Sequence, residues 1–175
     1  MRFNKKFIIA IICIIFGTNS FALQMSEINK ILSAHNAIRA EHGLAKLKWS
    51  DELSENATQW VGKLASERGC KMSHSYISGL GENLFWSSPL IYTQSRREIA
   101  NVNPLDVVNA WAAEKKYYSL GSNRCLFGQV CGHYTQLIWR DTVKVGCAKA
   151  ICDDKSQVWS CNYSPPGNYV GQKPY

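Results

Sequence analysis

The chain has 175 residues, of which 46% are hydrophobic and 19% charged, and its formal net charge is +7. Its length suits a single domain with a substantial core, since domains typically have about 100 to 150 residues, and no linker or internal repeat divides it. The basic residues are scattered and form no stripe interleaved with aromatic side chains, which argues against a nucleic-acid partner.

The first 22 residues have the layout of a secretory signal peptide. A basic start from Met1 to Lys6 precedes an apolar run from Phe7 to Phe16 and small residues that end at Ala22. Cleavage is expected after Ala22, which would remove Cys13 and three basic residues, leaving six cysteines and a net charge of +4. The apolar run is too short to cross a bilayer, and no later stretch reaches about 18 apolar residues. We therefore expect a secreted, extracellular protein with no transmembrane anchor.

Apolar residues at helical spacing predict two helices in the first part of the mature chain. The first covers Ser26 to His42, and a glycine follows it as a stop. The second begins at the cap residue Ser50 and ends near Gly69. Within the first helix we expect His35 to pack against the core and His42 to lie at the surface.

A third helix has the clearest start signal. Asn103 is the expected cap, and Pro104 takes the first helical position, where its missing N–H has no cost. The apolar pattern continues towards Tyr118. A shorter helix is expected from His133 to Trp139.

The last part of the chain predicts strands. Two short runs, Lys144 to Ile151 and Gln157 to Tyr163, flank a polar turn and indicate an antiparallel hairpin. Residues 86 to 103 are rich in Ser, Pro and Asn and are expected to form a long surface loop. Helices first and strands last favour an α+β domain in which helices cover an antiparallel sheet.

The hairpin also indicates a disulfide pairing. Cys147 and Cys161 are equidistant from Asp154 in the turn, so an antiparallel register would place them opposite each other. Two further cysteines bracket residues 126–130, a short loop that a bond could close, and the last two would tie the second helix to the sheet. A bond between Cys152 and Cys161 is the main alternative. The three expected bonds are Cys70–Cys152, Cys125–Cys131 and Cys147–Cys161.

Two segments are specific enough to indicate a family. They are Gly132-His133-Tyr134-Thr135-Gln136-Leu137-Ile138-Trp139 and Cys161-Asn162-Tyr163-Ser164-Pro165-Pro166-Gly167-Asn168-Tyr169. Together with Gly81-Glu82-Asn83-Leu84 and Trp111-Ala112-Ala113-Glu114, they resemble the signature motifs of the CAP superfamily, which joins cysteine-rich secretory proteins, insect venom antigens and plant pathogenesis-related proteins. The resemblance is closest to the first group of the plant pathogenesis-related proteins and runs from about Ser26 to Tyr175.

The resemblance implies one CAP domain over residues 23–175, folded as a three-layer α-β-α sandwich with a small antiparallel sheet. It also implies a central cleft lined by His74, Glu82, Glu114 and His133. Two imidazoles and two carboxylates suit a weak divalent-metal site, with zinc as the candidate cofactor. The spacing itself is not a metal motif, and the four side chains could instead form a structural network.

The resemblance further implies lipid binding. Members of the superfamily bind sterols and fatty acids, and the sterol site involves a loop before the first signature motif. Here that loop covers Ser119 to Val130, where Leu120, Leu126, Phe127 and Val130 could line a lipid site or simply pack the loop against the body. The expected partners are sterols or other lipids and microbial membranes, and we expect a monomer.

These observations predict a non-enzymatic, sterol- or lipid-binding protein with a defence role, such as antifungal activity. One alternative is a peptide precursor, because Pro165 to Tyr175 resembles a segment that plant members release as a signalling peptide. Another is a metal-dependent hydrolase or protease, with one of the two glutamates as base. Ser73 and Ser75 flank His74, but adjacency in sequence does not establish nucleophile geometry, so we assign no catalytic residue.

Overall fold

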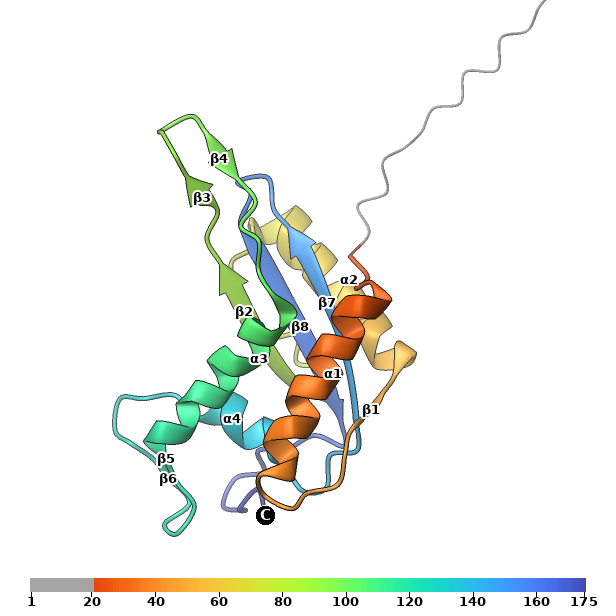
Figure 1. Cartoon of the computed structure of the whole chain (residues 1–175), viewed down its shortest axis with the longest axis vertical. Helices are drawn as coiled ribbons and strands as arrows, with labels where there is room; N and C mark the ends of the chain where they lie inside the picture. Colours follow the sequence, from red (N-terminus) through yellow and green to blue (C-terminus); the bar gives the residue numbers. More distant parts are fainter. Residues whose placement is uncertain (1–20) are drawn as a thin grey trace, which may run out of the picture.

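The computed structural model describes residues 21–175, in which helices pack on both faces of a sheet (Figure 1). The basic and apolar parts of the predicted signal peptide, residues 1–20, lie outside the described residues. Ala22, at the predicted cleavage point, forms an isolated bridge with Ala148, and Leu23 is buried. No helix within residues 21–175 is long and apolar enough to cross a membrane.

The first two predicted helices are confirmed, with boundaries close to those expected. Helix α1 is Met25–Ala40 and α2 is Asp51–Arg68. The hydroxyl of Ser50 accepts a hydrogen bond from the backbone N–H of Leu53, as an N-cap does. Gly69 ends α2 in the left-handed conformation, with φ of 54°, which glycine adopts at little cost.

The third helix begins as predicted and ends earlier. Helix α3 is Pro104–Ala112, and the side chain of Asn103 accepts a hydrogen bond from the N–H of Leu105. The predicted continuation towards Tyr118 is a 3-10 turn instead. The other elements of this region are η1 (Ala113–Tyr117), β5 (Tyr118–Ser119), β6 (Arg124–Cys125) and α4 (Gly132–Leu137).

The central sheet has the strand order β1-β7-β8-β2. The predicted hairpin is confirmed, since β7 (Lys144–Ile151) and β8 (Gln157–Ser164) pair antiparallel. Two further strands were not predicted from the sequence. Strand β2 (Gly81–Ser87) pairs antiparallel with β8, whereas the short β1 (Lys48–Trp49) pairs parallel with β7. The sheet is therefore mixed, which corrects the expectation of a purely antiparallel one.

The predicted surface loop at residues 86–103 contains a hairpin. Strands β3 (Leu90–Ile91) and β4 (Arg97–Glu98) pair antiparallel and project beyond the sheet (Figure 1). The Thr93 hydroxyl closes the turn by accepting a hydrogen bond from the N–H of Arg96. The hairpin was not predicted because the composition of residues 86–103 is typical of a loop and its two strands are too short to show a periodic pattern.

The fold is the predicted three-layer sandwich. Helix α2 covers one face of the sheet, and α1, α3 and α4 cover the other (Figure 1). A side chain at Gly146 would overlap the backbone of Ser50 and Ser54, so α2 lies directly on β7 there. Alternate residues of β7 and β8 supply both cores: Val145, Cys147, Trp159, Cys161 and Tyr163 on the α1 side, and Ala148, Ala150 and Val158 on the α2 side.

The structure contains the three disulfides expected from the sequence. Cys147 and Cys161 are register partners, with their Cα atoms 4.1 Å apart. Cys70, just beyond α2, joins Cys152 at the end of β7, across a separation of 82 residues. Cys125 and Cys131 close the short loop of residues 126–130, which we call the disulfide loop.

Candidate functional site

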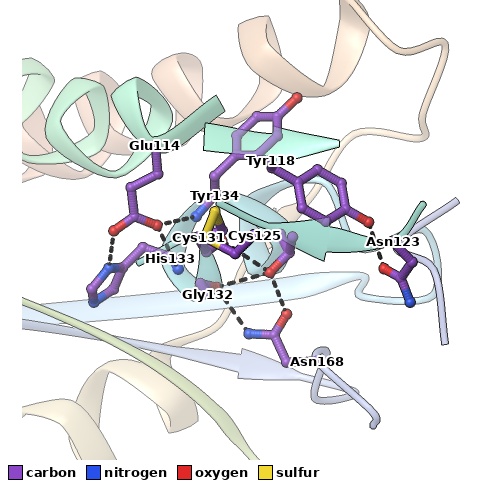
Figure 2. Close-up of a disulfide and its surroundings, with 10 residues drawn as sticks. Glu114, Tyr118, Asn123, Cys125, Cys131, Gly132, His133, Tyr134 and Asn168 are labelled. Atoms are coloured by element: carbon purple, nitrogen blue, oxygen red, sulfur yellow. Dashed lines mark hydrogen bonds and ion pairs between the residues drawn. A yellow bond between two sulfur atoms is a disulfide. The ribbon is translucent and has the colours of Figure 1, made fainter. Parts of the chain in front are cut away.

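Glu114, in η1, holds the start of α4. One carboxylate oxygen accepts hydrogen bonds from the backbone N–H groups of His133 (3.0 Å) and Tyr134 (3.1 Å), and the other lies 2.6 Å from Nδ1 of His133 (Figure 2). The first N–H groups of a helix have no partner within it, so a carboxylate placed there satisfies them. Glu114 therefore both caps α4 and orients the His133 ring.

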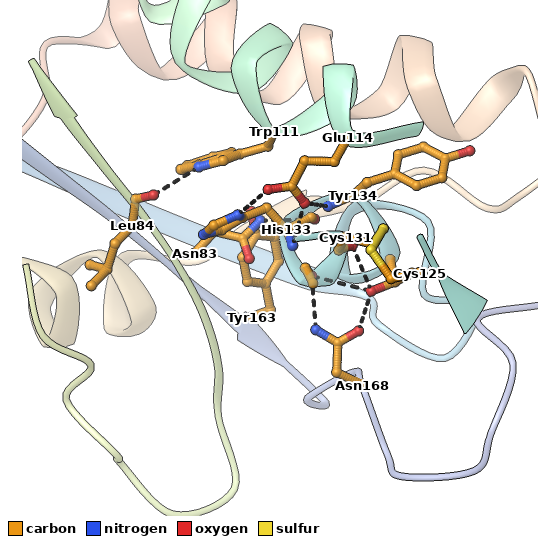
Figure 3. A network of polar contacts seen from close by, with 12 residues as sticks. Asn83, Leu84, Trp111, Glu114, Cys125, Cys131, His133, Tyr134, Tyr163 and Asn168 are labelled. Carbon is orange, nitrogen blue, oxygen red and sulfur yellow. Dashed lines mark hydrogen bonds and ion pairs between the residues drawn. A yellow bond between two sulfur atoms is a disulfide. The ribbon is translucent and has the colours of Figure 1, made fainter. Parts of the chain in front are cut away.

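Trp111 encloses the other side of this histidine. Its ring stacks on the ring of His133, with centroids 6.3 Å apart and planes inclined by 16°. The indole N–H donates to the carbonyl of Leu84 at 2.9 Å, which connects α3 to β2 (Figure 3). The His133 ring is thereby held between a carboxylate and an indole.

A second histidine–glutamate pair lies at the start of β2. Nδ1 of His74 is 2.6 Å from Oε1 of Glu82, and the same oxygen accepts a hydrogen bond from the N–H of Ser75. The hydrogen bond with Glu82 raises the pKa of His74, against the opposing effect of partial burial. The Glu82 side chain is only 7% exposed and the His74 side chain 48%. The other carboxylate oxygen of Glu82, Oε2, is buried with no hydrogen-bond partner.

The four predicted cleft residues thus form two separate pairs. In each pair, Nδ1 of the histidine faces a carboxylate, which leaves Nε2 as the nitrogen free to bind a ligand. Within residues 21–175, no group of three or more His, Cys, Asp or Glu side chains is placed to hold a metal ion. Zinc binding by these four residues stays a prediction.

A buried hydrogen-bond chain that the sequence does not predict runs beneath His133. The amide of Asn83 donates to the His133 carbonyl (3.1 Å) and to the hydroxyl of Tyr163 (3.2 Å) (Figure 3). That hydroxyl lies 2.9 Å from Nε2 of His35. Nδ1 of His35 lies 2.8 Å from the Ile31 carbonyl. Since a carbonyl can only accept, Nδ1 carries the proton and Nε2 accepts from Tyr163. His35 is buried, as predicted, and is neutral in this arrangement.

Because His35 is buried and neutral in this hydrogen-bond chain, we expect the protein to lose stability in mild acid. Burial lowers the pKa of His35 from 6.5 to about 4; the Ile31 carbonyl opposes the shift and Arg39 adds to it. The unfolded chain binds a proton near pH 6.5 and the folded one does not, so stability present above pH 6.5 is lost as the pH falls to about 4. The free energy of unfolding should fall by about 3 kcal/mol over this window, as measured by urea titration at each pH.

A His35→Gln variant should be less stable and should show a flatter pH dependence in the same window. His42→Gln is the matched control, because partial burial also lowers the pKa of His42 but that ring is only half-buried. His74 does not interfere, since its raised pKa changes stability only above pH 6.5. Equal pH dependence in the wild type and in His35→Gln would contradict the prediction.

The four predicted lipid-site residues differ in exposure. Leu120 is half-buried, whereas Leu126, Phe127 and Val130 are exposed on the disulfide loop. Leu126 and Phe127 border an open depression of about 500 Å³, with Lys116 and Arg124 on its rim. The structure places these two apolar residues beside basic ones, a combination that the sequence interpretation did not include.

The segment Pro165 to Tyr175, called here the C-terminal segment, is folded against the body. The N–H of Gly167 donates to the side chain of Gln136, and the carbonyl of Pro174 accepts from Arg140. The hydroxyl of Tyr175 lies 2.7 Å from Nδ1 of His42, whose Nε2 lies 3.0 Å from the hydroxyl of Tyr134. His42 therefore links the end of the chain to α4, which corrects its interpretation as a surface residue.

No nucleophile–base pair accompanies these histidines. Among residues 21–175, no serine hydroxyl is hydrogen-bonded to a histidine ring, and Nδ1 of His74 is engaged by Glu82 rather than by Ser73 or Ser75. All six cysteines of the described chain are in disulfides. In both histidine–glutamate pairs, the carboxylate also accepts a backbone N–H, which positions the neighbouring elements.

Comparison with known proteins agrees with this fold and these motifs. The model of the cysteine-rich secretory protein family, CAP, matches residues 32–163. The chain is 42% identical to pathogenesis-related protein 1C of Nicotiana tabacum over 144 residues, which cover 82% of this chain and 78% of that protein. It is also 42% identical to pathogenesis-related protein PR-1 of Medicago truncatula over 148 residues, or 84% of this chain and 78% of that protein.

Solved structures share the fold at lower identity. BmVAL-1 superposes with a TM-score of 0.69 at 24% identity, covering 87% of this chain and 83% of that one. Venom allergen-like protein 4 of Schistosoma mansoni gives a TM-score of 0.62 at 23% identity, covering 87% and 95%.

Proposed function

The chain belongs to the cysteine-rich secretory protein family, CAP, and we propose that it is a secreted, non-enzymatic protein that binds sterols or related lipids in defence against microbes. Its similarity to plant pathogenesis-related proteins supports a defence-type CAP protein. Three disulfides suit an oxidising, extracellular compartment. Antifungal activity through sterol capture is the specific role that we propose.

The observation that carries lipid binding is the disulfide loop beside its depression. A small loop closed by Cys125 and Cys131 presents Leu126 and Phe127 to solvent at the edge of a hollow of about 500 Å³. Exposed apolar side chains on a loop fixed by a covalent bond favour an apolar ligand, because little conformational entropy is lost on binding.

The two histidine–glutamate pairs support a positioning role in this function. Glu114 and His133 secure α4 and the adjoining loop, while Glu82 and His74 secure the start of β2. Among residues 21–175, no group of three or more His, Cys, Asp or Glu side chains is placed to hold zinc. We therefore expect zinc binding to be weak and lipid binding not to require it.

The direct test is binding of radiolabelled cholesterol and ergosterol to the oxidised protein, with and without zinc. Saturable binding is expected in both conditions. It should persist in His74→Gln/His133→Gln and weaken by at least about tenfold in Leu126→Ser/Phe127→Ser, because two apolar contacts are lost. Absence of saturable binding by the wild-type protein would refute the proposal. A strict requirement for zinc would mean that the two histidine–glutamate pairs take part in lipid binding through a metal ion.

The precursor alternative ranks second. Pro165 is exposed, but the carbonyl of Ser164, at the bond to be cut, accepts a hydrogen bond from Val143 at the end of β8. A protease needs that bond in an extended, free backbone, so the last turn of the sheet would have to open before release of the C-terminal segment. A hydrolase ranks lower still, because both glutamates are already engaged.

A further inference from the structure

One end of the molecule presents an unusual set of exposed apolar side chains. Phe127 is 99% exposed and Val170 102%, while Leu126, Val130 and Tyr169 are half or more exposed. These five residues, called here the apolar end, come from the disulfide loop and the C-terminal segment. Scattered exposed apolar residues are ordinary, but a group projecting from one end is typical of a contact surface.

The C-terminal segment is tied to the turn between β5 and β6, which directly precedes the disulfide loop. The amide of Asn123 donates to the carbonyl of Gln172 at 2.9 Å, and the ammonium of Lys173 donates to the carbonyl of Gly121 at 3.2 Å. Cys125 and Cys131, which close the disulfide loop, line a depression of about 310 Å³ together with Tyr169 of the C-terminal segment. Figure 1 shows both segments at the end of the molecule opposite the β3–β4 hairpin. The apolar end is therefore assembled in advance rather than formed by two independent loops.

The charge around the apolar end is positive. Within residues 114–131 and 165–175, the single carboxylate side chain is that of Glu114, which is engaged by His133. Lys115 is paired with Glu41. Lys116 and Arg124 share a depression with Leu126 and Phe127, so positive charge lies directly beside the most exposed apolar residues. The basic residues of these segments are Lys115, Lys116, Arg124 and Lys173.

We propose that the apolar end docks on an anionic lipid bilayer, with Phe127 and Val170 inserted at the headgroup boundary and Lys116 and Arg124 against lipid phosphates. The inference rests on the proposed lipid-binding function and assigns that function a membrane surface. Fully exposed, projecting side chains suit a deformable lipid phase better than the closely packed centre of a protein interface. Basic side chains beside them match the negative potential of anionic lipids.

The opposite end of the molecule provides a contrast. The β3–β4 hairpin also exposes apolar residues, including Ile91 and Tyr92. Its basic residues, however, lie beside acidic ones: Arg96 pairs with Glu98, and Arg97 contributes to lowering the pKa of Asp154 in the β7–β8 turn. The hairpin therefore combines apolar exposure with basic residues that lie beside carboxylates, and serves as an internal control.

The test is flotation of the oxidised protein with sterol-free vesicles of phosphatidylcholine, with or without phosphatidylserine. Binding is expected to the anionic vesicles and to decrease as salt is added. Phe127→Ser/Val170→Ser should weaken it by at least about tenfold. Lys116→Gln/Arg124→Gln should weaken it by about 25-fold, because each basic residue contributes about fivefold. All four positions are at the surface, and unchanged thermal unfolding confirms that each variant is folded.

The matched control is Ile91→Ser/Tyr92→Ser, which removes exposed apolar groups from the hairpin and should leave vesicle binding unchanged. Equal binding to neutral and anionic vesicles, full binding by Phe127→Ser/Val170→Ser, or equal loss in the hairpin variant would each overturn the proposal. Saturable sterol binding without vesicle binding would overturn this inference and leave the proposed function in place. Loss of both activities would overturn both.

Discussion

Replacing Arg39 with methionine is expected to lower the free energy of unfolding by about 4 kcal/mol. Arg39 lies in α1 and is fully buried, and none of the groups that accept its hydrogen bonds is a carboxylate. Its guanidinium donates to five backbone carbonyls instead, at 2.7 to 3.3 Å. They belong to Ala45, Leu137, Trp139, Arg140 and Thr142.

The position of these carbonyls explains the size of the effect. Several belong to the end of α4 and the turn after it, where helix carbonyls have no partner within the helix. A cation is favourable at a helix C-terminus, and burial strengthens this interaction. Methionine would fill much of the space and leave the carbonyls without donors, so the cost comes from unsatisfied acceptors rather than from a cavity.

Thermal unfolding measures the prediction, because about 4 kcal/mol corresponds to a decrease in Tm of roughly 8 to 16 °C for a domain of this size. Arg39→Lys keeps the charge but has fewer donors, and should lie between the wild type and Arg39→Met. Arg140→Met is the matched control, because Arg140 is exposed and its substitution should change stability by no more than about 0.5 kcal/mol. An Arg39→Met protein as stable as the control variant would refute this account.

Removing the bond between Cys70 and Cys152 is expected to cost about 4 kcal/mol, the second large effect. In the chain-entropy model, a disulfide stabilises by restricting the unfolded chain, and the restriction increases with the loop that it closes. This bond joins residues separated by 82 positions, whereas Cys125 and Cys131 are separated by 6. The same model gives about 2 kcal/mol for the shorter loop.

Urea unfolding of Cys70→Ser/Cys152→Ser and Cys125→Ser/Cys131→Ser compares the two bonds directly. Both members of the longer-range bond are buried, at 1% and 4% exposure, so serine hydroxyls there add a desolvation cost that increases the difference. The variant that lacks the shorter bond should keep most of its stability. If it proved the less stable of the two, loop entropy would not govern these disulfides.

Much of the architecture is predictable from local signals. Ser50 and Gly69 mark both ends of α2, Asn103 and Pro104 mark the start of α3, and equal spacing about Asp154 gives the register of the hairpin. These signals are reliable because each residue type satisfies a backbone requirement at its own position. Because this register places Cys147 opposite Cys161, it also predicts the disulfide between them.

Other features have no local signal. Arg39 occupies an ordinary helical position, and four of its five acceptors lie 98 to 103 residues away along the chain. The link from His35 to Asn83 through Tyr163 joins three elements that meet only after folding. Strand β1 has two residues, too few for a periodic pattern.

The division of the four cleft residues into two pairs could not be predicted either. The family resemblance identifies His74, Glu82, Glu114 and His133, but it does not state which atoms face one another. Their separation follows from where η1, α4 and β2 place them. Glu114 meets the N-terminus of α4, whereas Glu82 meets the segment before β2.

The two cores of the sandwich share their central strands, and this has a consequence for how the domain unfolds. Residues of β8 alternate between the α1 side, with Trp159 and Tyr163, and the α2 side, with Val158. Neither helical layer can separate without exposing a strand on which the other depends. We therefore expect the domain to unfold as one cooperative unit, in which neither half is a stable fold by itself.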